Sequence, residues 1–340
     1  MYGQHLKSRR QFLQTTAAGC LAAAGFGNAW AQGTAGAQRI ERLDPALDRI
    51  LSTSQPIVEL GSGYGGPLGP AEGPLWWKEG GYLLFSDIHN DRRMKYTPGQ
   101  GVTLFKQGVG RANGLTRDTK GRLVACEHDT RRVTRLELDG SMTVVANQFQ
   151  GKRLSRPNDV IVKSDGSMYI TDPNASIVPE QWDMQHSAVL RVSADLGTTT
   201  LLFDDFVFPN GIAFSPDESV LYITDLRRNI IRAYDMQPNG LPAKQTGRVF
   251  ADLSGAEPGL ADGMKVDIEG NVYCGGSGGL WILDAKGKKL GRIVHGQPAT
   301  TNVGFGGDDW KTLFITTRSH LLSVNLNIPG MPVPTNVKPK

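Results

Sequence analysis

The stretch Gly166-Ser-Met-Tyr-Ile-Thr-Asp172 is an example of a short apolar strand that follows a polar turn and ends in a small or acidic residue. The 340-residue chain repeats this pattern five more times, at 81–87, 121–127, 219–225, 270–276 and 311–317. The last residues of successive copies lie 40, 45, 53, 51 and 41 residues apart. Steps of this size are typical of one four-stranded blade. Six copies therefore predict an all-β fold, a six-bladed β-propeller with four-stranded antiparallel blades around a central channel.

A second apolar strand follows each copy, as in Val189-Leu-Arg-Val192, and turn dipeptides such as Asp139-Gly140 favour antiparallel hairpins. The apolar run Pro56-Ile-Val-Glu-Leu60 lies before the first copy. We expect it to supply the outer strand of the sixth blade, because closing the ring removes exposed sheet edges. An open β-sandwich is the alternative fold.

The N-terminus has the features of an export signal. Arg9-Arg10 precedes an uncharged, Ala- and Gly-rich run at 15–26, and Ala29-Trp30-Ala31 matches an A-x-A cleavage site. We predict a twin-arginine signal peptide over 1–31, cleaved near Ala31–Gln32, and a periplasmic protein that the twin-arginine export machinery carries in folded form. Lipidation at Cys20 is an alternative.

The remaining chain divides into a linker (32–54), the propeller (55–327) and a C-terminal tail (328–340). The apolar run of the signal is too short to span a bilayer, so we expect no membrane association of the mature form.

Charge and cysteine content exclude several other classes of protein. The 37 Lys and Arg residues exceed the 33 Asp and Glu residues by only four, and three of the positive residues lie within 1–31. A nearly neutral mature chain gives no reason to expect a nucleic-acid partner. Only Cys126 and Cys274 remain after cleavage. They occupy equivalent strand positions in opposite blades, so we predict two free, buried thiols.

A polar residue stands fourteen or fifteen positions before the end of each copy, where the innermost strand of each blade begins. The six residues are Glu72, Asn113, Asn158, Asn210, Asp262 and Asn302. They should converge on the propeller axis at one end of the channel. Carboxylate and amide oxygens without His or Cys are the ligands of a hard divalent cation. The alternative is that each Asn or Asp only satisfies its local turn.

At these positions the chain resembles the gluconolactonase/regucalcin (senescence marker protein) family of six-bladed propeller hydrolases. The matching segments are Glu72-Gly-Pro-Leu-Trp76, Pro157-Asn-Asp159, Pro209-Asn-Gly211, Asp262-Gly-Met264 and Thr301-Asn-Val-Gly-Phe-Gly-Gly307. The resemblance covers the chain from about residue 55 to about residue 327.

The resemblance implies a divalent metal held by Glu72, Asn210 and Asp262, with Asn158 as a fourth ligand or a substrate contact. The metal would be Ca²⁺, with Mg²⁺, Mn²⁺ and Zn²⁺ as alternatives. It further implies that Asp262 is the base that activates water and that the reaction opens a sugar lactone. A metal with open positions would polarise the lactone carbonyl and lower the pKa of a bound water.

The resemblance also implies that Arg156 binds substrate, and we expect Asn113, Asn158 and Asn302 to do so as well. Close bacterial gluconolactonases often have Pro-Tyr-Gly where this chain has Asn174-Ala-Ser, in a loop that should border the pocket. The insertion 174–186 is therefore either a lid or a passive loop. Hydrolysis of another ester or a phosphotriester, and ligand binding without catalysis, are the alternative functions.

Overall fold

The computed structural model describes residues 37–334. The predicted signal peptide, with Arg9, Arg10 and Cys20, lies outside the described residues, as does the end of the predicted tail. Within the described part of the chain, no helix is both long enough and apolar enough to cross a membrane.

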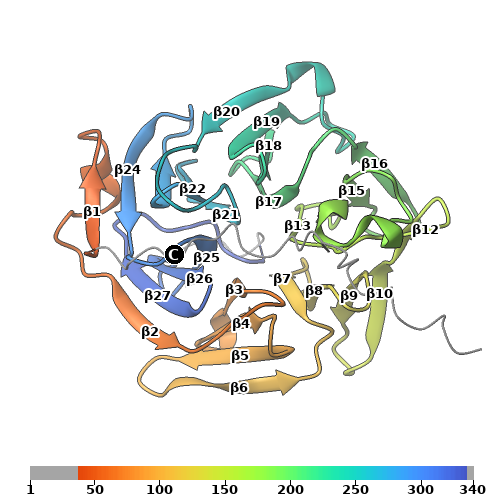
Figure 1. The fold of residues 1–340 in the computed structure, drawn as a ribbon, viewed down its shortest axis with the longest axis horizontal. Helices are drawn as coiled ribbons and strands as arrows, with labels where there is room; N and C mark the ends of the chain where they lie inside the picture. Colours follow the sequence, from red (N-terminus) through yellow and green to blue (C-terminus); the bar gives the residue numbers. More distant parts are fainter. Residues whose placement is uncertain (1–36, 335–340) are drawn as a thin grey trace, which may run out of the picture. The chain divides into compact units, whose positions relative to one another are not determined.

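Six antiparallel sheets surround a central axis (Figure 1). The first blade contains β3 (Ala71–Trp77), β4 (Tyr82–Asp87), β5 (Arg92–Thr97) and β6 (Gly101–Gln107). The second contains β7 (Ala112–Arg117), β8 (Leu123–Glu127), β9 (Arg132–Leu136) and β10 (Met142–Ala146). The third contains β13 (Val160–Val162), β14 (Met168–Asp172), β15 (Ala188–Val192) and β16 (Thr199–Phe203). A two-stranded ribbon, β11 (Gln148–Phe149) and β12 (Lys152–Arg153), separates the second and third blades.

The fourth blade contains β17 (Pro209–Phe214), β18 (Val220–Asp225), β19 (Ile230–Asp235) and β20 (Arg248–Asp252). The fifth contains β21 (Met264–Val266), β22 (Val272–Gly276), β23 (Gly279–Leu283) and β24 (Lys289–Val294). The sixth contains β25 (Thr300–Gly306), β26 (Thr312–Thr317) and β27 (His320–Asn325). The helical turns are α1 (Leu47–Ile50), η1 (Lys78–Gly80), η2 (Asn174–Ser176), η3 (Pro179–Gln181) and η4 (Lys244–Thr246).

The predicted propeller is confirmed strand by strand. Each second strand ends at the residue that ends the corresponding sequence repeat, for example β14 at Asp172. β2 (Val58–Ser62) pairs with β27 and supplies the outer strand of the sixth blade, as expected from the run before the first repeat. The ring is therefore closed by chain segments from its two ends.

The stretch predicted as a linker contributes to the propeller. β1 (Arg39–Arg42) pairs with β24 and makes the fifth blade five-stranded. Leu47 and Ile50 of α1 are buried in the same apolar cluster as side chains of the fifth and sixth blades. Within the predicted tail, Met331 donates its backbone N–H to Val266 O at 3.1 Å.

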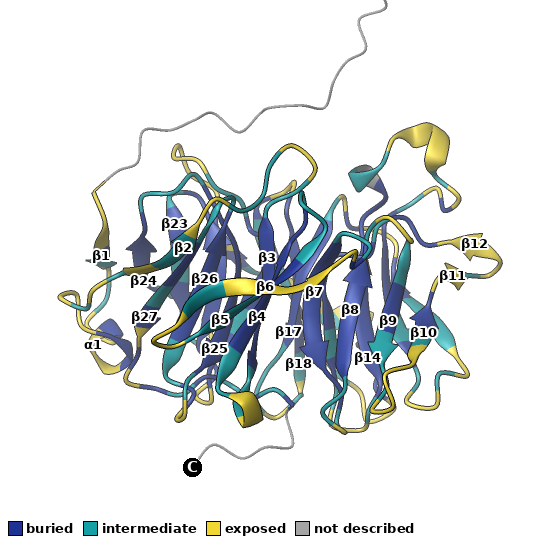
Figure 2. Ribbon diagram, turned by 90° about the horizontal axis from the view of Figure 1, so that it is seen from below, coloured by how far each residue is buried: buried dark blue, intermediate teal, exposed yellow. Residues whose placement is uncertain are grey.

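The apolar core lies between neighbouring blades. Trp76 of the first blade stacks on Phe314 of the sixth, with ring centroids 5.6 Å apart. Residues of the inner strands are buried and those of the outer strands are more exposed, most clearly along β6 (Figure 2). Cys126 and Cys274 are both buried and free, as predicted. This packing holds the inner strands rigidly around the axis, where the polar residues gather.

Candidate active site at the mouth of the channel

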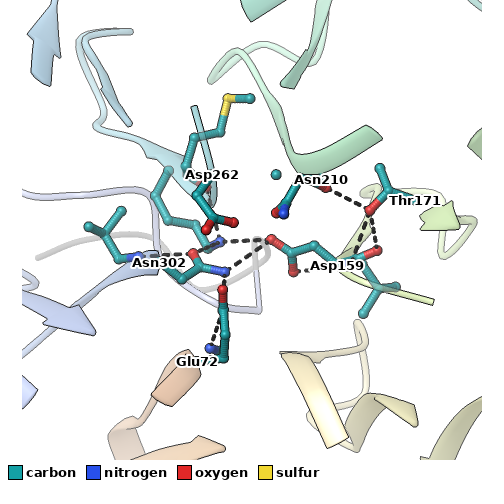
Figure 3. Close-up of polar contacts among 12 residues, drawn as sticks. Glu72, Asp159, Thr171, Asn210, Asp262 and Asn302 are labelled. Atoms are coloured by element: carbon teal, nitrogen blue, oxygen red, sulfur yellow. Dashed lines mark hydrogen bonds and ion pairs between the residues drawn. The ribbon is translucent and has the colours of Figure 1, made fainter. Parts of the chain in front are cut away.

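The predicted polar residues meet at one end of the channel. Glu72, Asn113, Asn210 and Asn302 lie near the starts of β3, β7, β17 and β25, while Asn158 and Asp262 stand two residues before the starts of β13 and β21. All six are at least nine-tenths buried. Figure 3 shows Glu72, Asn210, Asp262 and Asn302 pointing toward a common centre. We call these six residues the polar ring.

Bulges in the inner strands turn these side chains toward the axis. The pairing of β3 with β4 shifts between Glu72 and Leu75, and equivalent shifts occur in the first strands of the second, fourth and sixth blades. A bulge places two residues opposite one and redirects a side chain. The glycine after several ring residues permits this close approach. A Cβ at Gly114 would lie 2.5 Å from Asp159 Oδ1, and one at Gly263 would overlap the Asn302 side chain.

Acidic residues that end second strands bind the backbone segments that lead into the polar ring. Asp172 accepts hydrogen bonds from the backbone N–H groups of Ser155 and Arg156, both at 2.7 Å. Asp225 accepts equivalent bonds from Val207 and Phe208. These segments immediately precede Asn158 and Asn210 in the chain. These aspartates are therefore hydrogen-bond acceptors for the turns that lead into the ring.

Hydroxyl groups of the first, third, fourth and sixth blades also bind the ring segment of the next blade. The donors and accepting carbonyls are Ser86 to Asn113, Thr171 to Asn210, Thr224 to Asp262 and Thr301 to Ala71. These buried bonds run from blade to blade around the channel. They fix the backbone of the ring independently of any bound group.

The side chains of the ring are linked to one another. Asn302 Nδ2 donates to Glu72 Oε2 at 3.0 Å, and Glu72 Oε2 also accepts the Gly73 N–H at 2.8 Å. Asn302 Oδ1 accepts the N–H of Val303 at 2.9 Å. The oxygen of Asn302 thus satisfies a local backbone group, as the turn interpretation expected, while its nitrogen orients Glu72.

Two charged residues at the ring were missed by the sequence analysis. Asp159 Oδ2 lies 3.4 Å from Asn302 Nδ2 and 3.7 Å from Lys265 Nζ. Lys265 Nζ also donates to Met264 O at 3.0 Å. One signal for Asp159 was present in the repeats. It occupies the position after the ring residue, where four of the other five blades have Gly and one has Val.

Three oxygens of the ring are buried without a hydrogen-bond partner among the described residues. They are Asn113 Oδ1, Asn210 Oδ1 and Asp262 Oδ1. Unpaired buried oxygens are costly, and a hard cation satisfies this donor set. No group of three or more His, Cys, Asp or Glu in residues 37–334 could hold a metal ion. A cation here would therefore need amide oxygens beside the carboxylates, which is what the ring offers.

The two predicted carboxylate ligands have strongly perturbed acidity. Burial raises the pKa of Glu72 to about 7, and the nearby charge of Asp159 adds to the rise. Burial also raises the pKa of Asp262 well above its ordinary value, and the charges of Glu72 and Asp159 act in the same direction. The neighbouring Asn210 side chain and the Gly263 N–H oppose this rise. Such a cluster of shifted carboxyls is typical of a functional site.

Asn113 and Arg156 lie on one side of the mouth with His128, which the sequence did not indicate. Asn113 Nδ2 lies 3.2 Å from His128 Nε2, and only a neutral imidazole can accept there. Burial lowers the pKa of His128 well below its ordinary value, and the Arg156 charge adds to this. Arg156 Nη1 also donates to Ser176 O at 3.3 Å. The 174–186 insertion therefore contacts the residues that border the mouth.

The fold and the ring define a class of protein: a six-bladed propeller whose channel mouth concentrates buried carboxylate and amide oxygens. The SMP-30/gluconolactonase/LRE-like family profile matches residues 70–319, and the chain belongs to this family.

Individual relatives agree with this assignment. The gluconolactonase of Zymomonas mobilis is 31% identical over 319 residues, covering 86% of this chain and 87% of that protein. The pentonolactonase of Haloferax volcanii is 30% identical over 250 residues, covering 72% of this chain and 80% of that protein. The solved structure of a gluconolactonase from Xanthomonas campestris has 30% identity and a TM-score of 0.76, covering 86% and 96% of the two chains.

Proposed function

We propose that this protein is a divalent-metal-dependent hydrolase that opens a sugar lactone in the periplasm. The observation that carries the proposal is the set of unpartnered buried oxygens on Asn113, Asn210 and Asp262, next to the Glu72 carboxyl. The names of the bacterial and archaeal relatives support lactones as the substrate class.

Glu72, Asn210 and Asp262 would hold the metal, with Asn158 as a fourth ligand. The all-oxygen donor set favours Ca²⁺ over softer metals. When bound, the cation supplies a Lewis acid that polarises the lactone carbonyl.

Asp262 would act as the base. Its raised pKa makes its carboxylate a stronger proton acceptor than a solvent-exposed one, which offsets the acidifying effect of a nearby cation. It accepts a proton from water as the water oxygen bonds to the carbonyl carbon. The same proton then passes to the ring oxygen as the C–O bond breaks, giving a hydroxy acid. Arg156 and Asn113 would orient the hydroxyl groups of the sugar.

A panel of aldono-lactones, with acid release followed at constant pH, tests this proposal. We expect turnover of at least one five- or six-carbon sugar lactone, loss of turnover with chelator, and recovery on addition of Ca²⁺. Turnover of simple esters or phosphotriesters alone would identify a different hydrolase. Tight binding of lactones without acid release would make the protein a ligand-binding propeller.

A further inference from the structure

A second polar cavity lies away from the channel, between the outer parts of the first and second blades. It has a volume of about 310 Å³, at the lower end of the range for small-molecule sites. Residues of β5 and β6 line one side of it and residues of β8, β9 and β10 line the other. Figure 1 shows these strands in neighbouring blades. We call this cavity the blade groove.

Arg93 of β5 lines the blade groove and has no partner of its own. Its side chain is buried, with 7% of the residue exposed, and Nε has no hydrogen bond. Within residues 37–334, no carboxylate forms an ion pair with its guanidinium. Burial lowers the pKa of Arg93 to about 10, and only the more distant charge of Glu127 opposes this. A buried, unpaired guanidinium lowers the stability of the folded protein. A stabilising role therefore does not explain the presence of Arg93 at this position.

The neighbouring acid cannot serve Arg93, because it is already occupied. Glu127 accepts hydrogen bonds from Thr130 Oγ1 at 2.6 Å, Arg132 Nε at 2.8 Å and Thr134 Oγ1 at 2.8 Å. The exposed Lys106 also lines the groove and forms no ion pair with a described residue. Two positive charges of the groove, those of Arg93 and Lys106, are therefore left without a counter-charge.

Glu127, Thr130, Arg132 and Thr134 also line the groove and are bonded to one another. Five apolar side chains form the other part of the lining: Val109, Leu123, Ala125, Leu136 and Met142. A guanidinium binds a carboxylate through two parallel N–H groups, and apolar walls favour a hydrocarbon body over a polyol. We propose that the blade groove binds an organic carboxylate with a short apolar body, whose carboxylate pairs with Arg93. This site is separate from the polar ring and does not depend on the function proposed for it.

Titration of the full mature protein with hexanoate tests the proposal, with binding followed by calorimetry and by the unfolding temperature. We expect saturable binding that weakens as salt is added. Arg93→Met should weaken hexanoate binding about tenfold or more, because it removes the bidentate donor. Lys106→Gln, at an exposed position, should weaken it only several-fold and provides a second variant if Arg93→Met does not fold.

The matched control is Arg117→Met. Arg117 is equally buried, at 6% exposure, but pairs with Glu79 at 2.8 Å outside the groove. Without ligand, Arg93→Met should keep or raise the unfolding temperature, whereas Arg117→Met should lower it and leave hexanoate binding unchanged. Three results would overturn the proposal: no binding by the wild type up to about 10 mM, unchanged affinity in Arg93→Met, or equally tight binding of inorganic phosphate.

Discussion

Lys265 Nζ lies 3.7 Å from Asp159 Oδ2, directly beside the polar ring. Asp159 is 2% exposed on its side chain, whereas Lys265 retains 22% exposure. The pair adds one negative and one positive charge to the ring. With Glu72 and Asp262 ionised, the whole cluster has a net charge of two negatives, which a divalent cation neutralises.

This charge balance makes a prediction for Lys265→Met. The variant leaves Asp159 buried without its cationic partner, so the chelated protein should lose about 2 kcal/mol of unfolding free energy. Saturating Ca²⁺ should recover part of the loss, because the cation is also near the third carboxylate. Chemical denaturation with and without Ca²⁺ measures both. The double variant with Asp159→Asn should be more stable than Lys265→Met alone, and an equal loss in the two would contradict the pairing.

Glu72 and Asp262 should differ when their charges are removed. Glu72→Gln is expected to weaken metal binding, with much of the turnover restored by excess metal, because Glu72 only anchors the cation. Asp262→Asn keeps an oxygen ligand but cannot accept a proton, so turnover should fall on the order of 10²–10⁴-fold and excess metal should not restore it. Metal titration and turnover are measured on the same folded samples. Near-wild-type turnover of Asp262→Asn at saturating metal would assign the base to another group.

The raised pKa of Glu72 predicts how the stability of the chelated protein depends on pH. The folded pKa of about 7 lies above the ordinary value of 4.5, so the folded state binds the proton more tightly than the unfolded chain. This stabilisation is complete below the unfolded pKa and is lost as pH rises through about 7. With chelator, the unfolding temperature should therefore fall between about pH 5 and about pH 8. Asp262 acts in the same direction.

Glu72→Gln is the control for this measurement, because it removes the titrating group and keeps the other buried acids, including Asp172. The variant should show a flatter decline of unfolding temperature with pH than the wild type. Identical pH profiles for the two proteins would show that Glu72 is not held protonated at neutral pH.

Export is tested at Arg9 and Arg10. Replacing both with Lys should leave folded precursor in the cytoplasm, because the twin-arginine machinery requires the arginine pair. Cell fractionation with an antibody against the mature protein measures the distribution, and because Lys keeps the positive charge, the variant tests the arginine side chains themselves. Normal periplasmic levels of the double variant would exclude this route.

The repeat pattern predicted the strands well, because each blade is a local hairpin structure that its own sequence encodes. The ends of β4 and β14 fall at the predicted residues, Asp87 and Asp172. The polar ring could be predicted for the same reason, because equivalent residues of the six repeats lie at the same distance from the propeller axis. The repeats could not predict contacts that occur only once in the fold and have no equivalent in the other blades.

Asp159, Lys265 and Arg93 illustrate this limit. Lys265 reaches Asp159 from another blade, and such a pair has no sequence spacing that identifies it. The burial of Arg93 depends on how two blades pack, which no local pattern contains. The contribution of β1 to the fifth blade is similar, because Arg39–Arg42 pairs with a strand more than 240 residues later in the chain.

The pairing of β2 with β27 also determines when the molecule can be completed. More than 250 residues separate these strands, so among the described strand pairs theirs has the largest loop-closure entropy. Blades one to five consist of local hairpins that can form as the polypeptide emerges from the ribosome, but the sixth remains without its outer strand until synthesis ends. High contact order makes this last step slow. Pairing of β2 with β27 therefore requires both ends of the propeller. A chain truncated before β27 would leave β2 unpaired and the ring open, and the exposed strand edges would favour aggregation.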